Sequence, residues 1–255
     1  MEVVDLIREQ VRRCEVAGVE ILCCPEAVIG GLADYSPRPA DFAIDAEGGQ
    51  LNEILAPLAN DSVATIVGFT EIDRLGRLFN SAAVYAEGTV VGVYRKLYPA
   101  IHRSVYHAGD ALPVFTVGGL TFGIVICLDS NYLEPARIMA ARGAAALFVP
   151  TNNGLPPGKG GPELVAAARN LDIARAIENS VSVIRADVVG RTPGLTAYGS
   201  SGIVDPDGNV LASATGDDLL IAEIETAPRE RRRGWNAAVN PAVAEEYARL
   251  VTGTR

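Results

Sequence analysis

The stretch Leu120-Thr-Phe-Gly-Ile-Val-Ile-Cys127-Leu-Asp129 indicates the fold class of this chain. Its strongly apolar part, Leu120 to Ile126, is typical of a buried strand. The residues from about Leu133 to Arg142 predict a helix soon after it, and the apolar run Ala144 to Val149 predicts a second buried strand. Buried strands that alternate with helices indicate an α/β fold with helices packed on both sides of the sheet structure.

The same alternation extends over the rest of the chain. Further helices are predicted at Val3–Ala17, Gln50–Ala59, Glu163–Asn179 and Pro241–Val251. Further strands are predicted at Glu20–Cys24, Val63–Phe69, Val181–Asp187 and Leu219–Ile224. Two hairpins turn at Glu87-Gly88 and at Asp205-Pro-Asp-Gly208, so we expect mixed sheets. We find no internal repeat and no linker, which favours one α/β domain over residues 1–255.

Composition and charge narrow the range of functions. The 255 residues are 49% hydrophobic and carry a formal net charge of −9, and an acidic chain repels the phosphates of nucleic acid. No apolar run approaches the roughly 20 residues that span a bilayer, and no secretory leader is evident. The four cysteines lack zinc-binding spacing, and two histidines alone make a poor metal site. We expect a cytoplasmic protein with no metal or cofactor and no nucleic-acid or membrane partner.

Three reactive side chains follow predicted strands at the point where each strand enters a loop, and ligand sites in α/β proteins favour such strand ends. They are Glu26, Lys96 and Cys127. Each also has a plainer interpretation when taken alone. Glu26 could be a helix cap or a surface charge, Lys96 a solvated lysine, and Cys127 a small buried hydrophobe.

Cys127 is the candidate nucleophile. It follows a buried strand and precedes a predicted helix by a short loop. A thiol near helix N-terminal amides, with a cation close by, has a lowered pKa and becomes nucleophilic. We therefore expect a depressed pKa at Cys127.

Together with their neighbours, these residues resemble the three catalytic motifs of the nitrilase superfamily of carbon–nitrogen hydrolases. The matching motifs, in order, are Pro25-Glu26, Arg95-Lys96 and Cys127-Leu-Asp129. Two later segments also resemble the family: Arg175-Ala-Ile-Glu-Asn179 and Gly199-Ser-Ser-Gly-Ile-Val-Asp-Pro-Asp-Gly208. The resemblance covers roughly residues 20–225.

The resemblance implies a role for each residue of the motifs. Cys127 is the nucleophile and forms a thioester with the acyl part of the substrate, while Glu26 acts as general base. Lys96 stabilises the tetrahedral oxyanion, and the backbone N–H of Leu128 is the second donor. Tyr132, Asn152 and Asn153 lie next to the motifs and are candidates for binding substrate; ordinary loop packing is an equal alternative for each.

For the whole chain, the resemblance implies a four-layer α-β-β-α sandwich with two mixed sheets. It also implies a homodimer or a larger homo-oligomer, with the C-terminal tail, about residues 226–255, in the contacts between subunits. Family chains usually begin with a strand before the first helix, and this sequence begins at the helix. Either the true start codon lies upstream, or the sheet has lost that strand.

A second departure concerns the substrate. Many family members carry another glutamate a little after the lysine, but the residues from Leu97 to Tyr106 include no acid. Either His102, Arg103 or Ser104 occupies that place, or its role is met elsewhere.

The leading hypothesis is hydrolysis of a small linear amide or N-carbamoyl compound with release of ammonia. True nitrilases tend to carry tryptophan and glutamate after the cysteine, whereas Leu128 and Asp129 here are similar to the amidase and carbamoylase branches. The alternatives are a catalytically weak binding or regulatory module, and acyl transfer from the same thioester to an amine.

Overall fold

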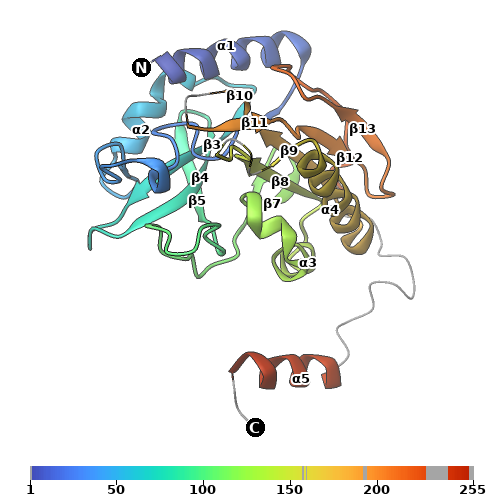
Figure 1. The fold of residues 1–255 in the computed structure, drawn as a ribbon. Coiled ribbons are helices and arrows are strands. Elements are labelled where there is room, and N and C mark those ends of the chain that lie inside the picture. The colour runs from blue at the N-terminus through green and yellow to red at the C-terminus, as the bar shows by residue number, and fades with distance from the viewer. Residues whose placement is uncertain (1, 157, 159, 192–193, 228–240, 253–255) are drawn as a thin grey trace.

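The computed structural model describes residues 2–156, 158, 160–191, 194–227 and 241–252 (Figure 1). Its α-helices are α1 (Glu2–Ala17), α2 (Gln50–Leu55), α3 (Leu133–Ala141), α4 (Glu163–Asn179) and α5 (Pro241–Thr252). Its 3-10 helices are η1 (Ala33–Tyr35), η2 (Ala56–Leu58) and η3 (Cys127–Asn131).

The first sheet has the strand order β1-β3-β4-β5, with β2 paired to β3 beside this path. Its strands are β1 (Ile21–Cys23), β2 (Ile44–Asp45), β3 (Ala64–Ile72), β4 (Leu78–Ala86) and β5 (Thr89–Arg95). β1 and β2 run parallel to β3, whereas β3, β4 and β5 form an antiparallel meander. Among the described residues, β1 is paired on one edge only.

The second sheet has the order β13-β12-β9-β8-β7-β6. Its strands are β6 (Val114–Val117), β7 (Leu120–Ile124), β8 (Ala146–Thr151), β9 (Ser182–Asp187), β12 (Gly202–Val204) and β13 (Val210–Ser213). β7, β8 and β9 are parallel and form its centre, and the flanking pairs are antiparallel. A separate ribbon pairs β10 (Val189–Arg191) with β11 (Thr196–Tyr198).

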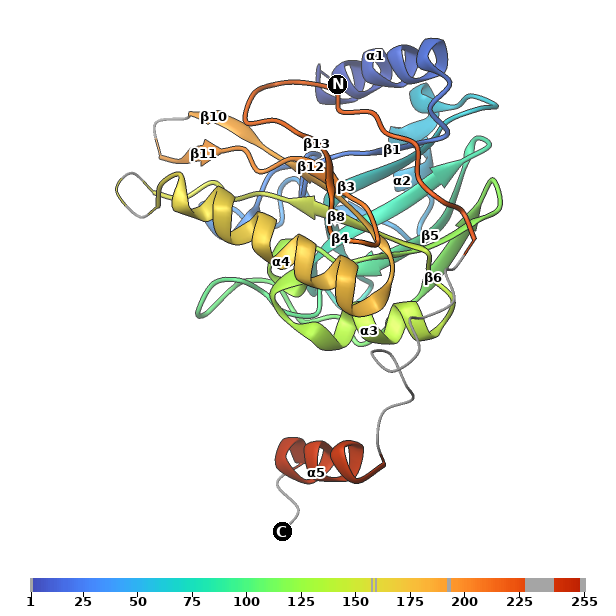
Figure 2. The same cartoon turned by 90° about the vertical axis from the view of Figure 1, so that its right-hand side faces the viewer.

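The elements stack in four layers, with α1 and α2 outside the first sheet and α3 and α4 outside the second (Figures 1 and 2). One core cluster joins the inner faces of both sheets with α3 and α4, and a second joins the first sheet with α1 and α2. The predicted α-β-β-α sandwich with mixed sheets is therefore confirmed.

The outer helix α1 shows how sequence spacing produces these layers. Its buried side chains are Val4, Ile7, Val11 and Cys14, which recur every three or four residues and so lie on one face of the helix. That face packs on the first sheet, and the charged residues between them face solvent.

The ends of β1 and β8 meet between the two sheets. The backbone N–H of Glu26 donates to the carbonyl of Thr151 at 3.3 Å. Gly68 of β3 makes this approach possible, because a Cβ there would lie 2.5 Å from the carbonyl oxygen of Pro25 and 2.6 Å from the nitrogen of Ala27. The sandwich thus brings the loops after β1 and β8 into direct contact.

The predicted strand at residues 219–224 is wrong. These residues form no strand, because no segment among the described residues pairs with their backbone in a ladder. The apolar side chains that suggested a strand are used for packing instead, with Leu219 against the outer core of the first sheet and Ile224 against the inner core.

The described residues bear only in part on two further predictions, those on a membrane span and on the C-terminal tail. Within the described ranges, no helix is long and apolar enough to cross a membrane. The predicted role of the C-terminal tail in subunit contacts falls partly on residues 228–240 and 253–255, which lie outside the described residues, and α5 covers the rest.

Candidate active site

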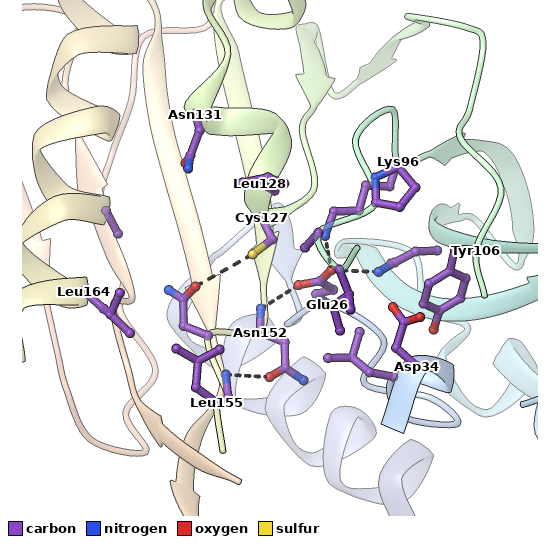
Figure 3. A pocket seen from close by; sticks show the side chains of 18 of the residues that line it. Glu26, Asp34, Lys96, Tyr106, Cys127, Leu128, Asn131, Asn152, Leu155 and Leu164 are labelled. Atoms are coloured by element: carbon purple, nitrogen blue, oxygen red, sulfur yellow. Dashed lines mark hydrogen bonds and ion pairs between the residues drawn. The ribbon is translucent and has the colours of Figure 1, made fainter. Parts of the chain in front are cut away.

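A cavity of about 250 Å³ opens where strands of the two sheets end (Figure 3). Its walls include six of the seven site residues that the sequence nominated: Glu26, Lys96, Cys127, Leu128, Asn152 and Asn153. In Figure 3 the ammonium of Lys96 and the carboxylate of Glu26 point toward each other, and the thiol of Cys127 lies beside them and is directed toward Asn153. Three segments that are far apart in sequence are thus brought to one cavity.

Cys127 lies at a sharp turn between β7 and η3. Its φ angle is 46°, in the left-handed region that non-glycine residues rarely adopt, and such strain is concentrated at functional sites. Ser130 stabilises the turn, because its Oγ donates to the carbonyl of Cys127 at 2.7 Å. The turn directs the thiol into the cavity at the first residue of η3.

The expected lowering of the Cys127 pKa is wrong. Burial raises the pKa of the thiol to about 12, the nearby Glu26 carboxylate raises it further, and the cations of Lys96 and Arg185 only partly oppose this. The sequence could suggest the cation but not how dry the cavity floor is. Cys127 is therefore a neutral thiol at rest and needs a base to become a nucleophile.

Glu26 places a buried carboxylate in the same cavity. Its side chain is 2% exposed and accepts three hydrogen bonds. Lys96 Nζ donates to Oε1 at 2.6 Å, Asn80 Nδ2 to Oε1 at 2.7 Å, and the backbone N–H of Asn152 to Oε2 at 2.8 Å. These donors compensate for the burial of the carboxylate and fix its orientation.

Lys96 remains a cation in spite of its burial. Its side chain is 3% exposed, and burial alone lowers the pKa of the ammonium. The negative charge of Glu26 and its hydrogen bond outweigh burial and raise the pKa of Lys96 above its usual value. The cavity thus holds a fixed positive charge beside the thiol.

Asp129 connects the cysteine turn with the loop after Lys96. Its carboxylate accepts hydrogen bonds from Tyr94 Oη at 2.7 Å, from the backbone N–H of Tyr98 at 2.9 Å and from that of Ile126 at 3.1 Å. Burial raises the pKa of Asp129 to about 6, although these hydrogen bonds lower it. The sequence marked Asp129 only as a sign of the amidase branch, and the structure gives it this connecting role.

Arg185 is a residue of the cavity that sequence reasoning missed. It lies on β9, is 4% exposed and forms an ion pair with Asp172 at 2.6 Å. Its other donors bind Thr151 Oγ1 at 2.7 Å and Ser130 Oγ at 2.9 Å. The signal was present, because an arginine inside a strand predicted to be buried must have a partner.

Asn153 is held by a second network that the sequence did not suggest. Its Nδ2 donates to Asp187 Oδ2 at 3.1 Å and to Ser200 Oγ at 3.2 Å. The amide oxygen is therefore turned toward Cys127, whose Sγ lies 3.8 Å away. Asp187 is the last residue of β9 and Ser200 lies between β11 and β12, so only the folded chain brings them to Asn153.

An acid is present near the place of the missing second glutamate, but it comes from another segment. Asp34 lines the cavity and accepts hydrogen bonds from Ser104 Oγ at 2.9 Å and from the backbone N–H of Val105 at 2.8 Å. His102 and Arg103 are exposed and do not line the cavity.

Tyr132 is not among the residues that line the cavity, contrary to its nomination. Its ring is 41% exposed and stacks on Tyr98 with the ring centroids 3.8 Å apart. η3 ends directly before Tyr132 and turns its side chain toward the surface. The neighbouring Asn131 lines the cavity instead.

No cluster of three or more histidine, cysteine, aspartate or glutamate side chains that could hold a metal ion occurs in the part of the chain that the structure describes. The polar groups that line the cavity include the thiol of Cys127, the carboxylate of Glu26 and the ammonium of Lys96, together with the amides of Asn152 and Asn153. Such a set can move a proton, form a covalent bond to carbon and stabilise a negative oxygen.

Comparisons with known proteins agree with this arrangement. The family model for carbon–nitrogen hydrolases matches residues 1–233. The chain is 30% identical over 221 residues to a nitrilase of Pyrococcus abyssi, which covers 84% of this chain and 80% of that protein. It is 31% identical over 203 residues to an (R)-stereoselective amidase of a Pseudomonas species, with 78% and 70% covered.

Solved structures share the fold. The carbon–nitrogen hydrolase from Helicobacter pylori G27 superposes with a TM-score of 0.78 at 24% identity, over 88% of this chain and 84% of that one. An amidase from a Nesterenkonia species gives a TM-score of 0.67 at 25% identity, over 84% and 80%. The match of the family model to most of the chain establishes that this protein belongs to the carbon–nitrogen hydrolase family, the nitrilase superfamily that its three motifs indicated.

Proposed function

We propose that the chain hydrolyses a small linear amide or N-carbamoyl compound through a thioester on Cys127 and releases ammonia. The observation that carries the proposal is the meeting of Glu26, Lys96 and Cys127 in one cavity, with Lys96 Nζ 2.6 Å from Glu26 Oε1. The naming of one relative as a stereoselective amidase and of another as an N-carbamoylputrescine amidase supports this class of substrate.

The first step is binding of the carbonyl group. Its oxygen accepts hydrogen bonds from Lys96 Nζ and from the backbone N–H of Leu128, which lies in the first turn of η3, where N–H groups have no acceptor within the helix. The carbonyl carbon then faces the thiol of Cys127. Fixed donors at the oxygen stabilise the negative charge that develops there, and one such donor contributes on the order of 10²–10³ in rate.

Acylation follows from the high pKa of the thiol. Glu26 takes the proton of Cys127 as sulfur attacks the carbonyl carbon, so thiolate forms only when substrate is in place. The tetrahedral intermediate collapses, the carbon–nitrogen bond breaks, and Glu26 returns the proton to nitrogen. Ammonia leaves, and the acyl group remains on Cys127 as a thioester.

Deacylation uses the same groups in reverse. Glu26 takes a proton from a water molecule, the oxygen of that water attacks the thioester, and the carbon–sulfur bond breaks. The proton returns to sulfur, which restores the neutral thiol and releases a carboxylic or carbamic acid. Splitting hydrolysis into two steps lowers the barrier of each.

The dimensions and walls of the cavity favour small substrates. A volume of about 250 Å³ is below the range of about 300–1,000 Å³ for sites that take drug-sized ligands. Apolar side chains line one side, among them Leu155, Leu164 and Leu171, and the polar groups are concentrated around Cys127. A short linear substrate fits this arrangement, with its terminal amide at the polar groups and its hydrocarbon part against the apolar side chains.

Replacing the nucleophile tests the proposal. We expect Cys127→Ala to lower ammonia release from a panel of linear amides and N-carbamoyl compounds by about 10⁴-fold or more, because the covalent route is lost. Mass spectrometry of wild-type enzyme mixed with the same panel should find an acyl adduct on Cys127. Cys23→Ala is the matched control, since Cys23 is partly buried nearby but does not line the cavity, and it should retain activity. Undiminished activity in Cys127→Ala would disprove the assigned nucleophile.

A further inference from the structure

Asn80 has an unused hydrogen-bond acceptor beside the reacting groups. It lies on β4, its side chain is 3% exposed, and it lines the cavity. Its Nδ2 donates to Glu26 Oε1 at 2.7 Å, but its Oδ1 is buried and has no hydrogen-bond partner among the described residues. A buried acceptor without a donor costs free energy, so such an atom in a native protein needs an explanation.

The orientation of the Asn80 amide follows from Glu26. Carboxylate Oε1 already receives the donor Lys96 Nζ and can only accept from its neighbours while it is ionised. The amide nitrogen of Asn80 must therefore face Glu26, and the amide oxygen must face away from it. If the amide were flipped, Asn80 Oδ1 would face Glu26 Oε1, and both of these oxygens are acceptors.

The position of Asn80 separates it from the other unpaired buried atoms. Within the described residues, side-chain atoms of Arg8, Thr65, Arg169 and Ser182 are also buried without a partner. None of these four residues lines the cavity, whereas Asn80 does. Among these five residues, Asn80 is thus the one that combines an unpaired buried acceptor with a place in the cavity wall.

The donor that the substrate can offer is its own amide nitrogen. In the proposed mechanism the carbonyl oxygen is taken by Lys96 and Leu128, which leaves two N–H groups of a primary amide in need of acceptors. The carboxylate of Glu26 already accepts three hydrogen bonds. The Asn80 side chain is next to this carboxylate, and its Oδ1 accepts no hydrogen bond from the described residues.

We infer that Asn80 Oδ1 accepts a hydrogen bond from the nitrogen of the scissile amide and holds this –NH₂ leaving group beside Glu26. The inference rests on the proposed function and adds a basis for selectivity. Asn80 favours substrates whose leaving group carries an N–H, that is primary amides and terminal carbamoyl groups, over esters. The hydrogen bond persists while Glu26 delivers the proton that converts –NH₂ to ammonia.

A pair of substrates with the same acyl group tests this, one a primary amide and the other an oxygen ester. Both form the same thioester, and kcat/KM reports steps up to its formation. Asn80→Leu removes both the donor to Glu26 and the acceptor for the substrate. Disturbance of Glu26 lowers kcat/KM for both substrates, and Asn80→Asp, which also loses the donor to Glu26 but keeps an acceptor, measures that contribution. Loss of the acceptor lowers kcat/KM for the amide alone. We expect the amide-to-ester ratio of kcat/KM to fall about tenfold, as one lost hydrogen bond implies.

Further variants complete the experiment. Asn80→Asp keeps an acceptor and should hold the ratio near its wild-type value, and Asn80→Ala repeats the loss if the leucine variant does not fold. Thr65→Val is the matched control, because Thr65 Oγ1 is also buried and unpaired, on the neighbouring β3 but outside the cavity. Its ratio should not change.

The outcomes separate the two proposals. An equal loss for amide and ester in Asn80→Leu, or a fall of the ratio in Asn80→Asp as large as in Asn80→Leu, overturns the inference and leaves Asn80 as a support for Glu26 alone. Wild-type enzyme that hydrolyses neither substrate overturns the proposed function and this inference together. Activity of Cys127→Ala equal to wild type overturns the assigned nucleophile whatever the ratio.

Discussion

At the scale of single residues, the high pKa of Cys127 is the property that most constrains the chemistry. A thiol whose pKa is raised to about 12 is almost wholly protonated at pH 8. The rate of alkylation by iodoacetamide should therefore be low at neutral pH and rise about tenfold per pH unit up to pH 10 without levelling off.

Replacing Glu26 with glutamine tests the effect of the carboxylate on the thiol. Glu26→Gln removes the negative charge that raises the pKa of Cys127, while the positive charge of Lys96 that lowers it remains, so the midpoint of the alkylation profile should move to lower pH. The same variant should lose amide hydrolysis, because the base is gone.

The measurement is alkylation followed peptide by peptide in a mass spectrometer. The buried Cys14 and Cys24, whose pKa values are also raised by burial, serve as internal references in both proteins. A midpoint for Cys127 that stayed in place or rose in Glu26→Gln would show that the carboxylate does not act on the thiol as described.

The sequence predicted that Glu26, Lys96 and Cys127 belong to one site, because each has a motif and a strand end that mark it, and the three residues line one cavity. It could not predict the pKa of Cys127, since burial depends on the packing of two sheets. It also could not predict the contact of Asp34 with Ser104, because 70 residues separate them and neither belongs to a motif.

At the scale of elements, Asp129 joins η3 to the loop that follows β5, and the pKa of its carboxyl gives this junction a pH dependence. Burial raises the pKa to about 6 in the folded protein, so the folded state binds this proton more tightly than the unfolded chain does. The contribution to stability is fully present below the unfolded value of about 4 and is lost as pH rises through about 6. The stability of wild type relative to Asp129→Asn, which does not titrate, should therefore fall by about 2 kcal/mol between pH 4 and pH 7.

Urea unfolding of both proteins at several pH values measures this difference, and groups common to both cancel. A difference that is flat across the range would mean that the hydrogen bonds from Tyr94, Tyr98 and Ile126 offset burial fully. Asp45→Asn is a control, because this carboxylate accepts its hydrogen bonds in an exposed turn.

Prediction of elements succeeded where the side chains show a clear period. The alternation of buried strands and amphipathic helices around β7, α3 and β8 was correct, because each element buries a face that its sequence displays. The same rule failed at residues 219–224, where apolar residues pack against both cores without a neighbouring strand. Strand pairing is a property of the partner as well as of the segment, and apolar spacing alone does not reveal it.

At the scale of the whole molecule, we propose that the chain forms dimers through the outer face of α3 and α4. This face, defined by Leu133, Ile138 and Ile177, exposes 45%, 38% and 38% of the respective side chains. The helix α5 lies beyond α3 in Figure 1, and Tyr247 Oη donates to Glu134 Oε1 at 2.5 Å, which extends the same surface. In an isologous dimer the same face of both subunits lies in the contact, so each of these apolar side chains would be buried on both subunits.

Ile138→Lys should therefore weaken association strongly. The substitution puts two charges in the centre of a two-fold contact and removes burial of about 1.5–3 kcal/mol per side chain, which corresponds to at least a hundredfold rise in the dimer dissociation constant. Sedimentation velocity over a range of protein concentrations measures that constant. Val16→Lys is the matched control, because Val16 is 92% exposed on α1, which covers the opposite outer face of the sandwich. If Ile138→Lys and wild type sediment alike at every concentration, subunits do not associate through α3 and α4, whereas an effect of Val16→Lys would move the contact to α1.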